Sequence, residues 1–196
     1  EDTKEFVEFA KLMEAVRENT NNPLEVNYDK ECGDFATGKS ASIHQGNWAY
    51  GMFKDYDMNF EMGMMALPLN GNDALAVSVP TCWYVNSQAS AAEIEAGKEF
   101  IEWLYTSETG AKYITEEFGF IPVVSTMESK SLDPLSQEVA RFTAEGKTIG
   151  WPMNAYWPAG IVDAHLVPVA EEFFTTNMTG TEFLRALTKA FVEAGK

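Results

Sequence analysis

Aromatic side chains beside Gly, Pro and Asn are the residues of this chain best suited to hold a ligand. They are Trp48, Trp83, Trp151, Tyr156 and Trp157, and each lies in a predicted loop or near a predicted strand end. A flat ring with polar neighbours suits a sugar, because the C–H face of the sugar packs on the ring while polar side chains bind its hydroxyls. The pattern therefore favours a binding site.

Trp48 is the leading candidate among these rings. It follows Gly46 and Asn47 at the end of the stretch FATGKSASIHQGNW, residues 35–48. The large apolar area of a Trp after a strand-ending glycine needs a partner, which is either the core or the flat face of a ligand. Local sequence leaves both interpretations open for Trp48 and Trp157.

Several other large side chains are expected to pack in the core. Trp83 lies inside an apolar strand candidate, and Trp103 lies inside a predicted helix. The same expectation holds for four methionines, because unbranched thioether side chains fill core gaps well. They are Met58, Met62, Met64 and Met65.

Motifs for catalysis or for cofactor binding are absent from the sequence. It contains no GxSxG elbow, HExxH helix, P-loop or glycine-rich dinucleotide loop. We expect His44 and His165 to be structural. Cys32 and Cys82 have no ligand-like spacing to these histidines, so neither a metal site nor a cofactor is predicted. Paired carboxylates cannot be located among 30 acidic residues.

Composition limits the class of protein further. The 196 residues suffice for one domain or two small lobes with a real core. A formal charge of −16 argues against a nucleic-acid partner, which requires a basic face, and against docking on an anionic membrane. No apolar run approaches the ~20 residues of a spanning helix, and the chain opens on a predicted helix rather than a leader.

Short helices and strands alternate along the chain, which is typical of an α/β fold. Capping boxes are predicted at Asp2 with Glu5, at Ser90 with Glu93 and at Thr179 with Glu182. Asp133 with Pro134 is expected to start a helix, Gly119 to end one, and Pro168 to kink or split its helix. Helices are predicted over 2–17, 90–105, 111–118, 134–142, 158–174 and 179–194, and strands over 40–45, 59–69 and 74–85.

Four segments in order resemble the second half of a family 1 extracellular solute-binding protein, the class that contains the maltose-binding protein. They are FATGKSASIHQGNW, MMALPLNG, AGKEFIEWLYTSETGAKYITEEFGFIPV and NMTGTEFLRALTKAF. Each segment alone is a weak signal, but four in the correct order are specific. The resemblance covers nearly the whole chain.

The resemblance implies a partial α/β fold of the periplasmic-binding-protein-like type II class. This would be the C-terminal part of a two-lobe protein, with mixed sheets flanked by helices. Residues 1–66 and 125–196 would belong to the second lobe, and residues 67–124 would return to complete the first. A missing N-terminal portion of the same protein would supply the rest.

The resemblance also implies a set of ligand-binding residues. Trp48 matches the stacking tryptophan of the family, and Asn47 beside it is expected to donate to a sugar hydroxyl. Tyr156, Trp157 and Trp151 compete for the place of a second ring. Thr81 lies where glycines usually line the cleft of family members.

The implied function is that of a non-enzymatic binding subunit of an ABC importer. It would bind a mono- or oligosaccharide, or another solute such as a polyamine, and deliver it to a membrane permease. The implied location is extracellular or periplasmic, with a lipoprotein tether. Two other classes stay open: a glycoside-acting enzyme with paired carboxylates about 5–10 Å apart, and a ligand sensor on the same fold.

Overall fold

The computed structural model describes residues 3–25, 27–79, 82–129, 132–151 and 153–195. The chain divides into two compact units, each of which is made of separate stretches of sequence. The first unit comprises Glu1–Ile43, Ala66–Ala74 and Trp151–Lys196, and the second comprises His44–Met65 and Leu75–Gly150. The lobe boundaries expected from the family resemblance concern a longer protein and stay a prediction.

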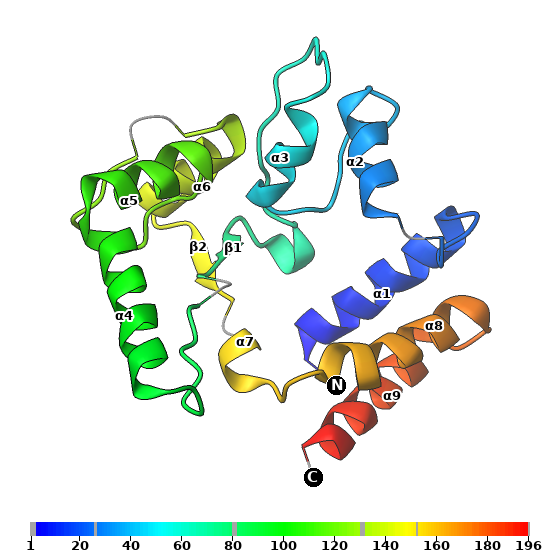
Figure 1. Cartoon of the computed structure of the whole chain (residues 1–196). Coiled ribbons are helices and arrows are strands. Elements are labelled where there is room, and N and C mark those ends of the chain that lie inside the picture. Colours follow the sequence, from blue (N-terminus) through cyan, green and yellow to red (C-terminus); the bar gives the residue numbers. More distant parts are fainter. Residues whose placement is uncertain (1–2, 26, 80–81, 130–131, 152, 196) are drawn as a thin grey trace. The chain divides into compact units, whose positions relative to one another are not determined.

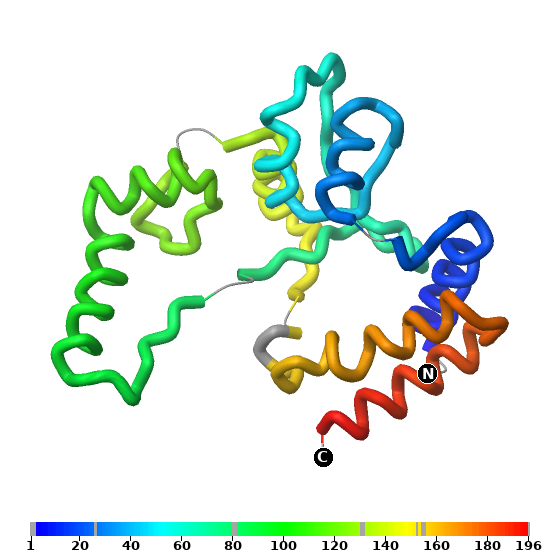
Figure 2. The backbone as a smooth tube through the Cα atoms, turned by 45° about the vertical axis from the view of Figure 1, so that its right-hand side comes forward, coloured from blue at the N-terminus to red at the C-terminus, as the bar shows by residue number. Residues whose placement is uncertain are grey.

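The first unit is almost entirely helical. Its elements are α1 (Lys4–Asn19), α2 (Tyr28–Ala36), η2 (Leu69–Gly71), α7 (Met153–Tyr156), η4 (Val162–Leu166), α8 (Val167–Thr175) and α9 (Gly180–Ala194). Helix α9 packs against both α1 and α8, as Figures 1 and 2 show at the ends of the colour scale. The two ends of the sequence therefore share one helical layer.

Phenylalanine rings form the core of this helical layer. Phe173 of α8 and Phe183 of α9 are buried, and their ring centroids lie 4.4 Å apart. Phe9 of α1 stacks on Phe183 at 6.2 Å. Aromatic pairs of this kind contribute about 0.5–1.5 kcal/mol beyond the area that they bury. This packing joins α1, near the start of the chain, to the two C-terminal helices.

Arg17 at the end of α1 binds the chain segment that follows α8. Its Nη1 atom donates to the carbonyl oxygens of Phe173 (3.0 Å), Thr176 (3.2 Å) and Met178 (2.7 Å). The guanidinium also lies 4.2 Å from the centroid of the Phe173 ring. These oxygens include carbonyls that the end of a helix leaves without intrahelical donors, so one side chain satisfies several of them.

The second unit combines short helices with a small parallel sheet. Its elements are η1 (Asn47–Ala49), α3 (Tyr50–Phe53), β1 (Leu75–Val77), α4 (Ala91–Thr106), α5 (Glu108–Lys112), η3 (Tyr113–Glu117), α6 (Pro134–Ala144) and β2 (Thr148–Gly150). Strands β1 and β2 pair in parallel, with Leu75 opposite Thr148 and Val77 opposite Gly150. Helix α6 precedes β2 and contacts β1 and η1.

The predicted helix signals are largely confirmed. Both capping boxes form, at the starts of α4 and α9, and Asp133 caps α6. Gly119 has φ +64°, the left-handed conformation expected where the helix ends. The predicted helix around Pro168 is split into η4 and α8. The predicted cap Asp2 lies outside the described residues. Thr3 caps α1, and its side chain accepts a hydrogen bond from the backbone N–H of Phe6.

The predicted strands are mostly wrong. Residues 40–45 and 59–69 contain no strand, and the strand expected over 74–85 is reduced to Leu75–Val77. An extended segment needs a neighbouring strand for its backbone groups, and within the described residues only β2 fills this role, for β1. The helix–sheet mixture agrees with a partial periplasmic-binding-protein-like fold, while the type II assignment stays a prediction.

Several side chains expected inside the structure lie at its surface. Trp83 is 53% exposed and Trp103 is 40% exposed, so neither packs in a core. Met65 is 74% exposed, and the other three methionines of its segment are half-buried. His44 and His165 are also exposed. The apolar setting of these residues in the sequence does not determine whether another segment covers them.

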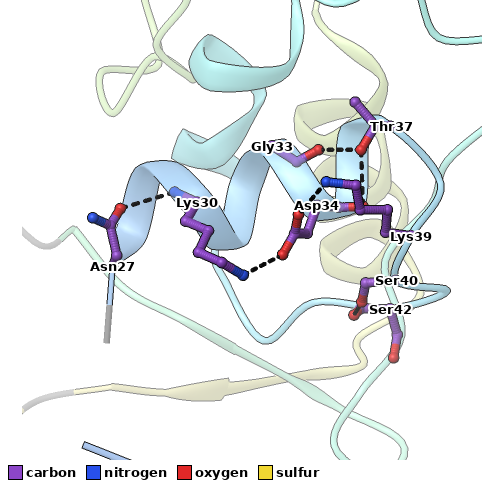
Figure 3. A network of polar contacts seen from close by, with 8 residues as sticks. All are labelled: Asn27, Lys30, Gly33, Asp34, Thr37, Lys39, Ser40 and Ser42. Carbon is purple, nitrogen blue, oxygen red and sulfur yellow. Dashed lines mark hydrogen bonds and ion pairs between the residues drawn. The ribbon is translucent and has the colours of Figure 1, made fainter. Parts of the chain in front are cut away.

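A polar network fixes the turn after α2, the segment that begins FATGK (Figure 3). The Asp34 carboxylate binds Lys30 Nζ at 2.6 Å and Lys39 Nζ at 3.0 Å, while its backbone oxygen accepts from the N–H groups of Lys39 and Ser40. Gly38 has φ +74°, which a glycine adopts without strain. The hydrogen bond from Lys30 holds the pKa of Asp34 below its usual value.

Replacing Arg17 by Met should destabilise the first unit. The change leaves three carbonyl oxygens without their charged donor, and such bonds contribute about 1.5–3 kcal/mol. Urea denaturation followed by circular dichroism measures the loss of unfolding free energy. Lys11→Met on the same helix is the control, because Lys11 forms an exposed ion pair with Glu8. Equal losses in the two variants would contradict the role given to Arg17.

Replacing Asp34 by Asn should lower stability in a pH-dependent manner. Because folding lowers the pKa of Asp34, its contribution is complete above the unfolded value of about 3.9 and is lost as pH falls through the folded pKa. The melting temperatures of parent and variant should therefore differ most at neutral pH and converge in acid. Asp57→Asn, at an exposed loop position, serves as the control. A difference that is constant with pH would show that Asp34 acts in another way.

Candidate ligand-binding site

The short helical turn η1 determines how Trp48 is presented. The turn contains Asn47, Trp48 and Ala49, and it follows Gly46 in extended conformation. Ala49 is fully buried, whereas Trp48 is 52% exposed. Adjacent residues of a turn point to different sides, so the small side chain enters the core and the indole ring stays at the surface.

Two neighbouring residues hold the indole ring in place. Trp48 Nε1 donates a hydrogen bond to Gln45 Oε1 at 3.3 Å. The six-membered part of the ring lies against Gly46, where a Cβ atom would overlap three of its carbons. This orientation of the ring therefore requires glycine at position 46, which has no side chain. The exposed ring is held by this contact and by the hydrogen bond to Gln45.

Asn47 attaches the same turn to the start of α6. Its Nδ2 atom donates to Ser136 Oγ at 3.1 Å, and Ser136 is fully buried. The backbone N–H groups of Leu135 and Ser136 in turn donate to Asp133 Oδ1, which caps α6. An amide carries two N–H donors and an acceptor oxygen, so the bond to Ser136 uses one of its donors. The site is thus built on a capped helix.

The remaining aromatic candidates belong to the first unit. Tyr156, the last residue of α7, is 80% exposed, and Trp151 is 39% exposed with its Nε1 3.3 Å from Met153 Sδ. Trp157 is half-buried and meets the ring of Phe191 edge-on at 5.5 Å. Tyr156 is therefore the most accessible ring of this loop, whereas Trp157 packs on α9. Trp48 belongs to the second unit.

Thr81, the last predicted site residue, lies outside the described residues. Two cavities of the chain lie away from all of the predicted rings. One, of about 240 Å³, is lined by residues of α1 and α9, including Glu14, whose carboxylate accepts from the N–H of Gly180 at 2.5 Å. The other, of about 410 Å³, is lined by residues such as Tyr105, Ser107 and Thr126.

No group of three or more His, Cys, Asp or Glu side chains that could hold a metal ion occurs within the described parts of the chain. Among the helices described, none is long and apolar enough to cross a membrane.

Comparison with known sequences identifies the family. The bacterial extracellular solute-binding protein family matches residues 5–131, which is more than half of the chain. The chain belongs to this family. The family is one of extracellular or periplasmic solute-binding proteins, and its members are in general not enzymes. The predicted membership of the solute-binding class is confirmed, and the match includes the first three of the four segments that suggested it, but not residues 177–191.

A curated relative adds a ligand to this comparison. The chain is 27% identical over 105 residues to the xylose/arabinose-binding protein XacG of Haloferax volcanii. The aligned part covers 52% of this solute-binding chain and 22% of that protein. The chain therefore spans only about a fifth of the length of the relative that it matches. No solved structure matches.

The sequence interpretation missed the residues that support the predicted ring. Gln45, Gly46 and Ser136 determine the position of the turn, and of these only Gly46 was singled out. Ser136 carried a partial signal, because it is the third residue after the predicted cap Asp133 and so lies in the first turn of α6. Its pairing with Asn47, 89 residues away in the sequence, was not deducible from local pattern.

Removal of the Asn47–Ser136 hydrogen bond should loosen the turn that carries Trp48. Ser136→Ala leaves the Asn47 amide without this acceptor and should lower the unfolding free energy by about 1–3 kcal/mol. A double-mutant cycle with Asn47→Ala isolates the pairwise contribution, for which we expect about 0.5–1.5 kcal/mol. The measurement is urea denaturation of the four proteins. Strict additivity of the two single changes would show that the side chains do not interact.

Proposed function

We propose that this chain is part of the sugar-binding component of an ABC importer, which binds a mono- or oligosaccharide and delivers it to a membrane permease. Membership of the solute-binding family supports the binding role. The Haloferax relative is a xylose/arabinose-binding protein, which supports a sugar as the ligand. A lipoprotein tether would keep such a protein close to its permease.

The exposed and fixed indole ring of Trp48 is the observation that carries this proposal. A ring that is 52% exposed has apolar area for a sugar face to cover. Gly46, Gln45 and Asn47 already hold the turn, so little ordering remains to be done when a ligand stacks. Pre-organisation of this kind increases affinity, because it reduces the entropy lost on binding.

The polar part of the site is proposed from the predicted residues. Asn47 lies next to the stacking ring, and its amide has donor and acceptor capacity beyond the bond to Ser136. Tyr156 offers the most accessible ring of residues 151–157, and Trp151 and Trp157 are the other candidate rings there. Thr81 would supply a further hydroxyl group to the ligand. These residues would contact the ligand from different elements of the longer protein.

Among sugars, the charge of the chain disfavours the acidic ones as ligands. A chain with a formal charge of −16 repels sugar acids and sugar phosphates, whereas it exerts no net force on a neutral pentose or hexose. We propose a neutral sugar such as xylose or arabinose, the ligands in the name of the relative. A metal or other cofactor has no part in this proposal.

The proposed mechanism is closure of two lobes around the sugar. Residues 67–124 are expected to belong to the first lobe, and residues 1–66 and 125–196 to the second. Both lobes would contact the ligand, and the N-terminal portion of the longer protein would complete the first. A sugar that contacts both lobes binds the closed form more tightly than the open form and so shifts the population toward closure. The permease would recognise the closed form.

Replacement of Trp48 by Ala tests the proposal in the longer protein that contains this chain. Titration calorimetry with D-xylose, L-arabinose and maltose should show binding of at least one sugar by the parent. The variant should lose about 1–3 kcal/mol of binding free energy, or about 5- to 150-fold in affinity, because an aromatic anchor is removed. Phe6→Ala is the matched control, since Phe6 is also 52% exposed but lies on α1.

The outcomes of this titration are distinct. Unchanged affinity of Trp48→Ala would remove Trp48 from the site. No heat with any sugar would contradict the ligand class, and the appearance of a hydrolysis product of maltose would favour the glycoside-acting alternative.

A further inference from the structure

The loop between α8 and α9 carries a motif that the proposed sugar site does not use. Residues 177–179 read Asn-Met-Thr, an asparagine followed two positions later by a threonine with no proline between them. This pattern is the acceptor sequon for N-linked glycans, and it is used on surface loops of secreted proteins. Every other asparagine of the 196 residues lacks a serine or threonine two positions later. The chain therefore contains one such sequon.

The structure presents the side chain of Asn177 to solvent. Asn177 belongs to no helix or strand and is exposed, although the loop runs between the buried residues Phe173 and Gly180. Among the described residues, none accepts a hydrogen bond from its amide nitrogen. The nitrogen that would carry a glycan is therefore accessible and is not engaged within the fold.

Arg17 fixes the backbone on both sides of Asn177. Its Nη1 atom donates to the carbonyl oxygens of Thr176 at 3.2 Å and of Met178 at 2.7 Å. The backbone N–H of Met178 also donates to Thr176 Oγ1 at 3.3 Å, and Thr176 has an extended backbone conformation. The two flanking residues thus bind α1 through their carbonyl groups, while the side chain between them stays at the surface.

Thr179 has a structural role that must be separated from a role in the sequon. Its hydroxyl donates to Glu182 Oε2 at 2.8 Å and accepts from the backbone N–H of Glu182 at 3.3 Å, so it caps α9. Serine, aspartate and asparagine cap helices at least as well as threonine does. The cap therefore explains a polar residue at position 179 but places no demand on position 177, two residues earlier. The exposed asparagine needs another explanation.

We propose that Asn177 is a site of N-linked glycosylation. The family is extracellular, so the loop would meet the enzymes that glycosylate exported proteins. The glycan itself needs no pocket, because its attachment requires only an exposed amide with free space around it. This inference rests on the extracellular class of the family and not on the ligand of the solute-binding site.

The reaction would be a transfer from a lipid carrier. The donor is an oligosaccharide joined through phosphate to a polyprenyl lipid, and the catalyst is an oligosaccharyltransferase in the membrane. A bond forms between Asn177 Nδ2 and the anomeric carbon of the sugar, while the bond from that carbon to the phosphate oxygen breaks. The lipid phosphate leaves with the bonding electron pair, and the amide gives one of its two protons to a base of the transferase.

The fold sets the time at which this transfer would occur. The sequon requires the hydroxyl of its third residue, and in the folded chain the Thr179 hydroxyl is bound to Glu182. Transfer would therefore take place before the first turn of α9 has formed. Afterwards the same hydroxyl caps the helix, and the glycan stays on the exposed loop.

Mass spectrometry tests the proposal on the longer protein that contains this chain, purified from the cells that naturally produce it. Cleavage after glutamate releases residues 173–182, FFTTNMTGTE. We expect this peptide to carry the added mass of one or more sugar residues, and electron-transfer fragmentation should locate that mass on Asn177. Asn86 is the matched control, because it is also exposed outside helices and strands but is followed by Ser87 and Gln88. It should stay unmodified.

Variants produced in the same cells separate the sequon from the helix cap. Asn177→Gln should abolish the added mass. Thr179→Asp should abolish it as well, although aspartate still caps α9, whereas Thr179→Ser should retain it, because serine supplies both the cap and the hydroxyl. Thermal unfolding followed by circular dichroism should show that the Thr179→Asp variant keeps its fold.

The contrary outcomes are equally definite. A peptide 173–182 without added mass in the protein from its natural source would overturn the proposal, and so would sugar attached to a threonine of that peptide in place of Asn177. Added mass that persists in Thr179→Asp would show that the sequon is not what is recognised. Failure of the longer protein to bind a sugar as its solute would count against the proposed function alone, since the attached glycan is detected independently.

Discussion

Burial of aromatic area is the constraint on which the rest of this structure depends. An aromatic side chain has about 150–250 Å² to bury, and each Å² removed from water contributes about 25 cal/mol. The buried aromatic residues are Phe53, Phe142, Phe173 and Phe183, all of them phenylalanines. The rings of Phe173 and Phe183 pack α8 against α9. Arg17 of α1 stabilises the same contact, because it donates to the carbonyl oxygens of Phe173 in α8 and of Met178 after α8.

Exposed rings of the second unit differ in how they are held. Trp48 is fixed by a glycine, a glutamine and an asparagine around one short turn, so its exposure has specific local support. Trp103, in contrast, meets the exposed rings of Phe100 and Tyr113 along α4 and η3. The first arrangement suits a small ligand that stacks on a single ring, whereas rings that tilt against one another offer no shared flat face.

Local signals predicted the helices better than the strands for a physical reason. A helix satisfies its backbone groups within one segment, so Ser90 with Glu93 and Asp133 with Pro134 were sufficient to place α4 and α6. A strand depends on a distant partner, and residues 59–69 have none in the described structure. The exposure of Trp83 and Trp103 was unpredictable for the same reason, since their apolar setting in the sequence does not reveal what covers them. Trp48 stays a predicted ligand-binding residue, and the sequence pattern identified the turn that carries it. The pairing of Ser136 with Asn47 joins residues 89 positions apart, so no local pattern could reveal it.

Gly46 has a consequence for how ligand preference can change in proteins of this kind. Any side chain at position 46 would displace the indole from its resting place, because a Cβ atom there coincides with the ring. With Trp48 as the proposed stacking ring, a substitution of Gly46 would change ligand preference while the tryptophan itself stays unaltered. The missing Cβ atom at position 46 would then determine ligand specificity as much as the ring of Trp48 does.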